Sequence, residues 1–81
     1  MRFDLQVMAA LVEHNLIHRG LVPLGMRNSV PVAQRILEAE NAQQVTAILD
    51  RAIKDFNDLE ETDTDLDGVF LFKAVRLIKG K

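Results

Sequence analysis

The chain contains no cysteine, and this absence excludes several classes of protein. Without thiols there is no disulfide framework, no thiolate zinc site and no cysteine nucleophile. The chain also has no run of about 18 apolar residues, the length needed to span a membrane, and its amino terminus lacks the basic region, apolar core and cleavage site of a signal peptide. These absences predict a soluble, cytoplasmic protein, although a lack of cysteine is also compatible with export.

Groups that could support catalysis or phosphate binding are equally scarce. Ser29 is the only serine and is expected to cap a helix, and no glycine-rich phosphate-binding loop is present. A net charge of -2 gives no overall attraction to nucleic acid, whose binding depends on neutralising phosphates. We therefore expect neither an enzyme nor a cofactor-binding protein, and we do not expect nucleic acid as the partner.

What is present is the composition of a folded protein, 48% hydrophobic and 27% charged over 81 residues. A chain of this length forms one domain, residues 1–81, that buries only about 60% of the surface its unfolded form exposes. It therefore lies near the lower size at which a single core suffices. A partner subunit would help to stabilise it.

The clearest element is a helix over Asn41–Leu59. Its start is well marked, because Asn41 can accept a hydrogen bond from the first turn and Gln44 occupies the position of a capping-box partner. The apolar residues recur every three or four positions and form one stripe of the helix. They are Val45, Ile48, Leu49, Ala52, Ile53, Phe56 and Leu59.

Opposite charges four positions apart occupy the other side of the same helix, each pair stabilising it by about 0.2–0.5 kcal/mol. They are Asp50 with Lys54 and Arg51 with Asp55. Together with a shorter helix after Pro31, this element could form a helix-turn-helix that binds DNA as a regulator. The carboxylates on its exposed side would be repelled by phosphate, so this interpretation is only an alternative.

Two further elements precede it. A first helix is expected over Arg2–Arg19. Residues 21–29 should be a connection that covers the core, followed by a second, shorter helix that begins at Ser29 or Val30 with Pro31 in its first turn.

The segment after Gly68 is almost entirely apolar and leaves only three basic residues for water, Lys73, Arg76 and Lys79. These lie close to one side of a helix, with positive charge toward its carboxyl end, so a helix is expected, capped by Thr64 or Asp65. Its apolar arc is unusually wide for so small a domain. The helix therefore either runs through the middle of the bundle or is partly covered by another chain.

These elements predict an all-α fold, a small bundle of three to four helices in which the first, third and fourth build the core and the second orients the third. The alternative is an α+β fold with short strands at Met1–Val7 and Val69–Val75, because both segments also carry strand-like patterns.

A calcium loop is suggested by Asp63, Asp65, Asp67 and Gly68, which match the opening of an EF-hand. The loop would close with a bidentate glutamate at its twelfth position, where this chain has Ala74. Half of the oxygen ligands are therefore missing. A degenerate calcium-binding module remains an alternative, and the favoured interpretation is that these carboxylates solvate the loop and interact with the amino end of the next helix.

His14 and His18 lie four positions apart, a spacing at which two imidazoles on a helix can share a metal ion. Glu13 precedes the first histidine, so the order of the zinc-protease motif HExxH is not met, and no third ligand is evident. We expect two solvated or half-buried histidines and no metal site.

The remaining interpretation is a non-enzymatic protein–protein interaction module. We expect a small inhibitor or adaptor that occupies a surface of a partner protein and self-associates as a homo-oligomer through its last segment. A basic amphipathic helix of this kind could also lie on a membrane, but its apolar side is needed for the core, so membrane association is not expected. The candidate partner-binding residues are Asp58, Glu60, Glu61, Asp63, Asp65, Asp67, Phe70 and Phe72.

Overall fold

The computed structural model describes residues 3–58 and 64–80, which form helices and connections without a strand. The helices are α1 (Phe3–His18), α2 (Met26–Glu38), α3 (Ala42–Asn57) and α4 (Asp65–Lys79). The predicted all-α bundle is confirmed. Of the predicted helix ends, Arg2 and Leu59 lie outside the described residues.

The alternative α+β fold is wrong. Residues 3–7 begin α1, and the whole of Val69–Val75 lies within α4. The strand-like signals were an alternation of apolar and polar residues in Met1–Val7 and aromatic and β-branched residues in Val69–Val75. Both are also compatible with a helix that buries every third or fourth residue. In α4 that spacing buries Leu71 and Val75 on one side.

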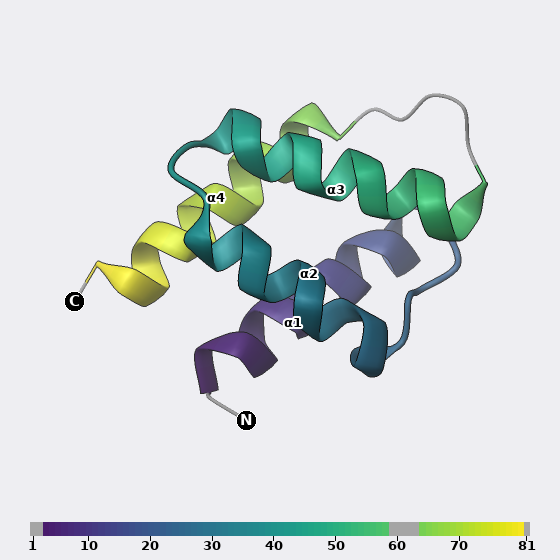
Figure 1. Ribbon diagram of the computed structural model, residues 1–81, viewed down its shortest axis with the longest axis horizontal. Coiled ribbons are helices and arrows are strands. Elements are labelled where there is room, and N and C mark those ends of the chain that lie inside the picture. Colours follow the sequence, from purple (N-terminus) through teal and green to yellow (C-terminus); the bar gives the residue numbers. More distant parts are fainter. Residues whose placement is uncertain (1–2, 59–63, 81) are drawn as a thin grey trace.

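The helices form two pairs. α1 packs most extensively on α2, and α3 packs most extensively on α4. In Figure 1, α2 and α3 lie in front, and the fainter α1 and α4 lie behind them. In this view no other helix of the described residues lies behind α1 or α4.

One hydrophobic core joins all four helices. Its largest fully buried side chains include Met8 and Leu16 from α1, Ile53 from α3 and Leu71 from α4. The expectation that α2 only orients α3 is wrong, because α2 contributes further buried side chains and makes its main contact with α1. These residues are Ala33, Ile36 and Leu37.

The start of α3 matches the predicted capping arrangement closely. The Asn41 side-chain oxygen accepts a hydrogen bond from the Gln44 amide at 2.9 Å. The Gln44 side chain reaches back to accept from the Glu40 amide at 2.8 Å, one residue before the position expected for a capping box. The helix ends at Asp58, which adopts a left-handed conformation with a φ of 54°.

The start of α2 differs from the prediction. Gly25 has a φ of 84°, a backbone conformation that glycine adopts without strain. Its carbonyl oxygen accepts hydrogen bonds from the amides of Asn28 and Ser29 at 3.0 and 2.9 Å. The helix therefore begins at Met26, before the expected position, and Pro31 lies inside it. Ser29 is a fully buried helical residue and not a cap, and its hydroxyl has no hydrogen-bond partner among residues 3–58 and 64–80.

The connection from α1 to α2 is held from two sides. The Leu24 amide donates to the Glu13 carboxylate at 2.9 Å, and Leu24 itself is buried, as expected for a segment that covers the core. Val22 exchanges two hydrogen bonds with Asn57 at the end of α3, of 2.8 and 3.3 Å. These contacts join the α1–α2 pair to α3.

Candidate functional site

Helix α4 carries apolar residues on two sides, and only one of them is used by the core. Gly68, Leu71 and Val75 are buried against the rest of the bundle. On the opposite side, large apolar side chains remain in solvent, with exposed fractions of 81% for Leu66, 44% for Val69, 51% for Phe70 and 75% for Leu77. We call these four residues the outer face of α4. Together they form an exposed apolar surface on one side of the helix, a feature often found at interaction sites.

The spacing along this surface is that of a helix–helix seam. Leu66, Phe70, Lys73 and Leu77 follow one another at intervals of four, three and four residues, the alternation found at the core positions of coiled coils. Leu66 and Leu77 are separated by about three helical turns and therefore lie on the same side of α4. The only charged member of the series is Lys73, which is exposed at its middle.

The amino end of α4 is fixed to α3 and to the residue that follows α1. The Asp67 carboxylate pairs with the Arg19 guanidinium at 2.8 Å, and both side chains are partly buried. The buried Thr64 hydroxyl donates to the Thr46 carbonyl oxygen at 3.3 Å. Gly68 lies directly against the Thr46 side chain, where a larger residue would not fit.

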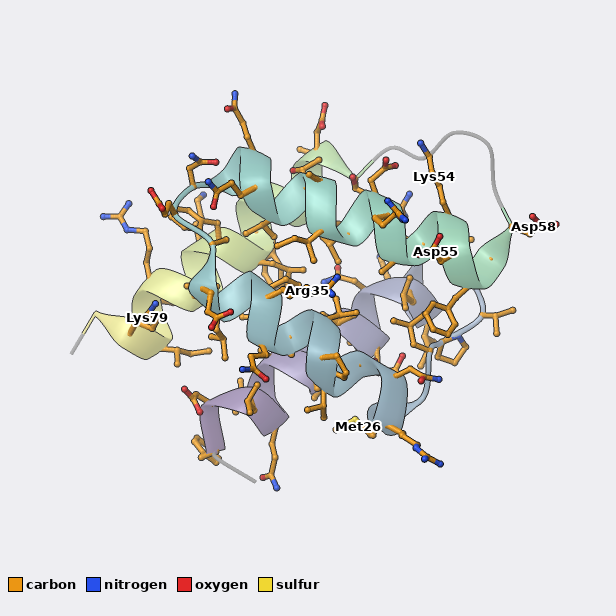
Figure 2. All side chains as sticks on the ribbon, viewed as in Figure 1. Met26, Arg35, Lys54, Asp55, Asp58 and Lys79 are labelled. Carbon is orange, nitrogen blue, oxygen red and sulfur yellow. The ribbon has the colours of Figure 1, made fainter. Side chains whose placement is uncertain are left out.

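The carboxyl end of α4 is fixed to α2. The Lys79 ammonium group donates to the Leu37 carbonyl oxygen at 2.8 Å, close to the end of α2 (Figure 2). Since α4 is anchored at both ends, its orientation is set by the bundle. The outer face is therefore presented to solvent as a fixed surface.

The apolar surface continues onto α1. An open groove of about 550 Å³ runs between the start of α1 and the end of α4. Its lining residues are Phe3, Asp4, Val7, Leu77 and Ile78. Leu77 thus belongs both to the outer face of α4 and to this groove, and Phe3 extends the exposed apolar area.

Charge is distributed unevenly along α4. The acidic residues Asp65 and Asp67 lie in its first turn, and the basic residues Arg76 and Lys79 lie in its last turn. Each charge lies at the helix end where the helix dipole stabilises it. Asp65 and Arg76 are exposed, so a molecule that binds along α4 meets negative charge at one end and positive charge at the other.

The predicted partner-binding residues are only partly brought together. Asp65 and Phe70 are exposed on α4, whereas Asp67 is engaged with Arg19 and Phe72 is partly buried against the core. Asp58 follows the carboxyl end of α3 (Figure 2). It lies about 18 Å along the axis of α3 from Thr46, the residue against which Gly68 of α4 packs, so it is distant from the start of α4. The three remaining candidates, Glu60, Glu61 and Asp63, lie outside the described residues.

The calcium alternative is not supported by the described part of its motif. Residues 65–74, which would form most of the calcium loop, lie in α4. A helix cannot wrap successive side chains around one cation as the irregular EF-hand loop does. Thr64 occupies the position before the helix as predicted, but its side chain bonds to Thr46 and makes no cap hydrogen bond.

The histidine pair shows no metal site either. His14 and His18 are both exposed on α1, with stacked rings whose centroids lie 6.2 Å apart. Within residues 3–58 and 64–80 no group of three or more potential ligands could hold a metal ion.

The predicted charge pairs on α3 are confirmed. Lys54 lies 3.1 Å from the Asp50 carboxylate, and Arg51 lies 3.3 Å from that of Asp55 (Figure 2 labels Lys54 and Asp55). The cations that a DNA-recognition helix would offer to phosphate are thus already paired with carboxylates of the same helix. No observation favours the DNA-binding alternative.

Comparison with protein-family models, with curated protein sequences and with solved structures found no match. None of the helices in the described part of the chain combines the length and the apolarity needed to cross a membrane.

Sequence reasoning identified α4 as unusually apolar but did not identify three residues of its outer face, Leu66, Val69 and Leu77. A signal for them exists in the sequence. Gly68, Leu71 and Val75 form one stripe of the helix, and the series from Leu66 to Leu77 forms another stripe opposite to it. The first stripe packs in the core, and the second is exposed.

Proposed function

We propose that this chain is a non-enzymatic protein-interaction module, an inhibitor or adaptor that binds through the outer face of α4. The observation that carries the proposal is the exposure of four large apolar side chains on one side of an anchored helix. Burying an apolar side chain of this size stabilises a complex by about 1.5–3 kcal/mol before the costs of association.

The rigid presentation of this surface supports the proposal. Ordering a mobile segment on binding opposes association, and α4 is already ordered by Arg19, Thr46 and Leu37. Exposed apolar residues on a fixed helix are the arrangement in which a partner can bury them at the smallest entropic cost.

Affinity capture with matched variants tests the proposal. The immobilised chain, a Leu66→Lys/Leu77→Lys variant and a Gln34→Lys/Met26→Lys control would be exposed to extract from the native host. The control adds the same two charges at exposed positions of α2. We expect at least one protein, further copies of this chain included, to be retained by the wild type and the control and lost with the α4 variant.

If every protein retained by the wild type is retained equally by the α4 variant, the outer face of α4 is not the binding surface and the proposal fails. Circular dichroism of the three proteins checks that each is folded. All four substituted positions are exposed, so folding is expected to be preserved.

A further inference from the structure

We propose that the outer face of α4 is occupied by α4 of a second copy of this chain, in antiparallel orientation, so that the protein forms a symmetric dimer. This inference rests on the proposed function and names the partner. It is carried by the way in which α4 complements itself in shape, apolarity and charge.

The apolar series fits an antiparallel copy of itself. When two α4 helices run in opposite directions, Leu66 of each lies opposite Leu77 of the other, and Phe70 lies opposite Lys73. Both pairs arise from one register, because 66 and 77 have the same midpoint as 70 and 73. In a two-fold symmetric interface every such contact occurs twice.

The one charged residue of the series is accommodated in this register. Lys73 of one copy meets the Phe70 ring of the other, which is exposed and can accept both the aliphatic part of the lysine and its ammonium group at the ring face. A parallel arrangement would instead place the two lysines opposite each other. The position of Lys73 therefore favours the antiparallel dimer.

The charges at the helix ends give the same orientation. Asp65 and Arg76 are exposed on one flank of the series and are separated, like Leu66 and Leu77, by eleven positions. With the leucines opposed, Asp65 of one copy lies within about 3 Å, measured along the axis, of Arg76 of the other. An arginine side chain spans this offset, so two intermolecular ion pairs form, and the oppositely directed helix dipoles are also arranged favourably.

The groove between α1 and α4 gives the second copy additional contact. Leu77 lines this groove together with Phe3 and Val7, so a helix that packs on Leu77 comes close to their apolar side chains. The contact then extends from one helix to two on each copy. This larger contact favours a dimer over a transient encounter.

Sedimentation equilibrium of the full chain with charge-reversal variants tests the dimer and its register. Asp65→Arg and Arg76→Glu each turn two ion pairs into two like-charge contacts, so each single variant should raise the dissociation constant by about tenfold. The double variant Asp65→Arg/Arg76→Glu restores both pairs with reversed polarity and should return to within about threefold of the wild type. Each single reversal also disfavours the helix end, and these losses add in the double variant, so recovery of the dimer cannot come from improved folding.

The outcomes separate this inference from the proposed function. A dimer whose affinity is unchanged by either single reversal overturns the antiparallel register. A chain that stays monomeric at the highest concentration measured overturns the second copy as occupant, and the proposed function then stands only if capture retains a different protein through the same face. If capture also shows no dependence on Leu66 and Leu77, both proposals fail.

Discussion

Helices α3 and α4 have nearly the same length, 16 and 15 residues, and they pack against each other, yet their solvent sides differ. On α3 the solvent side carries ion pairs within the helix, Asp50 with Lys54 and Arg51 with Asp55. On α4 it carries the four apolar side chains of the outer face. Only Phe56, in the last turn of α3, is comparably exposed there.

The two helices also differ in how their charged residues are arranged. Opposite charges alternate along α3 at a spacing of four, so they neutralise one another locally. On α4 the acids Asp65 and Asp67 lie in the first turn and the bases Arg76 and Lys79 in the last, too far apart to pair within one helix, with Lys73 between them. The charges of α3 are paired within the helix. The charges at the two ends of α4 are instead complementary to those of an antiparallel copy of the same helix.

The largest expected effect comes from the same substitution made on both helices. Leu49→Ala on α3 removes a side chain that is 2% exposed and should lower the free energy of unfolding by about 2–5 kcal/mol, because it leaves a cavity. Leu77→Ala on α4 should change it by less than about 0.5 kcal/mol. Urea denaturation at low chain concentration, where a dimer does not contribute, measures both. Equal losses for the two variants would contradict an exposed outer face.

The contact between α3 and α4 depends on the absence of a side chain at position 68. An added methyl group in Gly68→Ala would overlap the Thr46 side chain, and we expect a loss of about 1–3 kcal/mol in the free energy of unfolding. Alanine's higher helix propensity opposes this loss by about 1 kcal/mol. In a Thr46→Ala background the loss should be smaller, which a double-mutant cycle measures. An effect of Gly68→Ala that is the same in the Thr46→Ala background would show that the two helices are not in close contact there.

The start of α3 offers a smaller effect. Asn41→Ala removes the side-chain cap of α3 and should lower the free energy of unfolding by about 1 kcal/mol. Asn41→Gly should lower it by only about a few tenths of a kcal/mol. Thermal denaturation of the three proteins gives the comparison. If alanine and glycine are equally well tolerated, the Asn41 side chain does not cap the helix.

The smallest effects distinguish the ion pairs. Arg19 and Asp67 have side chains 24% and 21% exposed, against 80% and 57% for Arg51 and Asp55. Double-mutant cycles to alanine should give a coupling of about 1 kcal/mol for the first pair and less than about 0.5 kcal/mol for the second. The second coupling should also fall more steeply with added salt. A larger coupling in the exposed pair would mean that Arg19 does not anchor α4.

The features predicted correctly from the sequence are those decided within a few residues of one another. The Asn41 cap and the charge pairs of α3 depend on neighbours three or four positions away, so a pattern suffices to find them. The predicted start of α2 is wrong because Pro31 suggested a first turn, whereas the helix begins at Met26, directly after Gly25 with its positive φ.

The outer face of α4 depends on contacts between distant parts of the chain. The buried side of α4 packs on residues distant in the sequence, with Gly68 against Thr46, and Lys79 bonds to Leu37, 42 positions away. No local pattern contains that information. The role of α2 in the core was missed for a similar reason, since its main contact is with α1 and not with the adjacent α3.

The mass of the wild-type chain in solution, measured by light scattering over a range of concentrations, tests the central claim most directly. An antiparallel dimer through α4 predicts that the mass rises with concentration from 9.1 kDa toward twice that value. It also predicts that Leu66→Lys/Leu77→Lys holds the mass at 9.1 kDa over the same range. A wild-type mass that stays at the monomer value, or a dimer that the variant leaves intact, would contradict the claim.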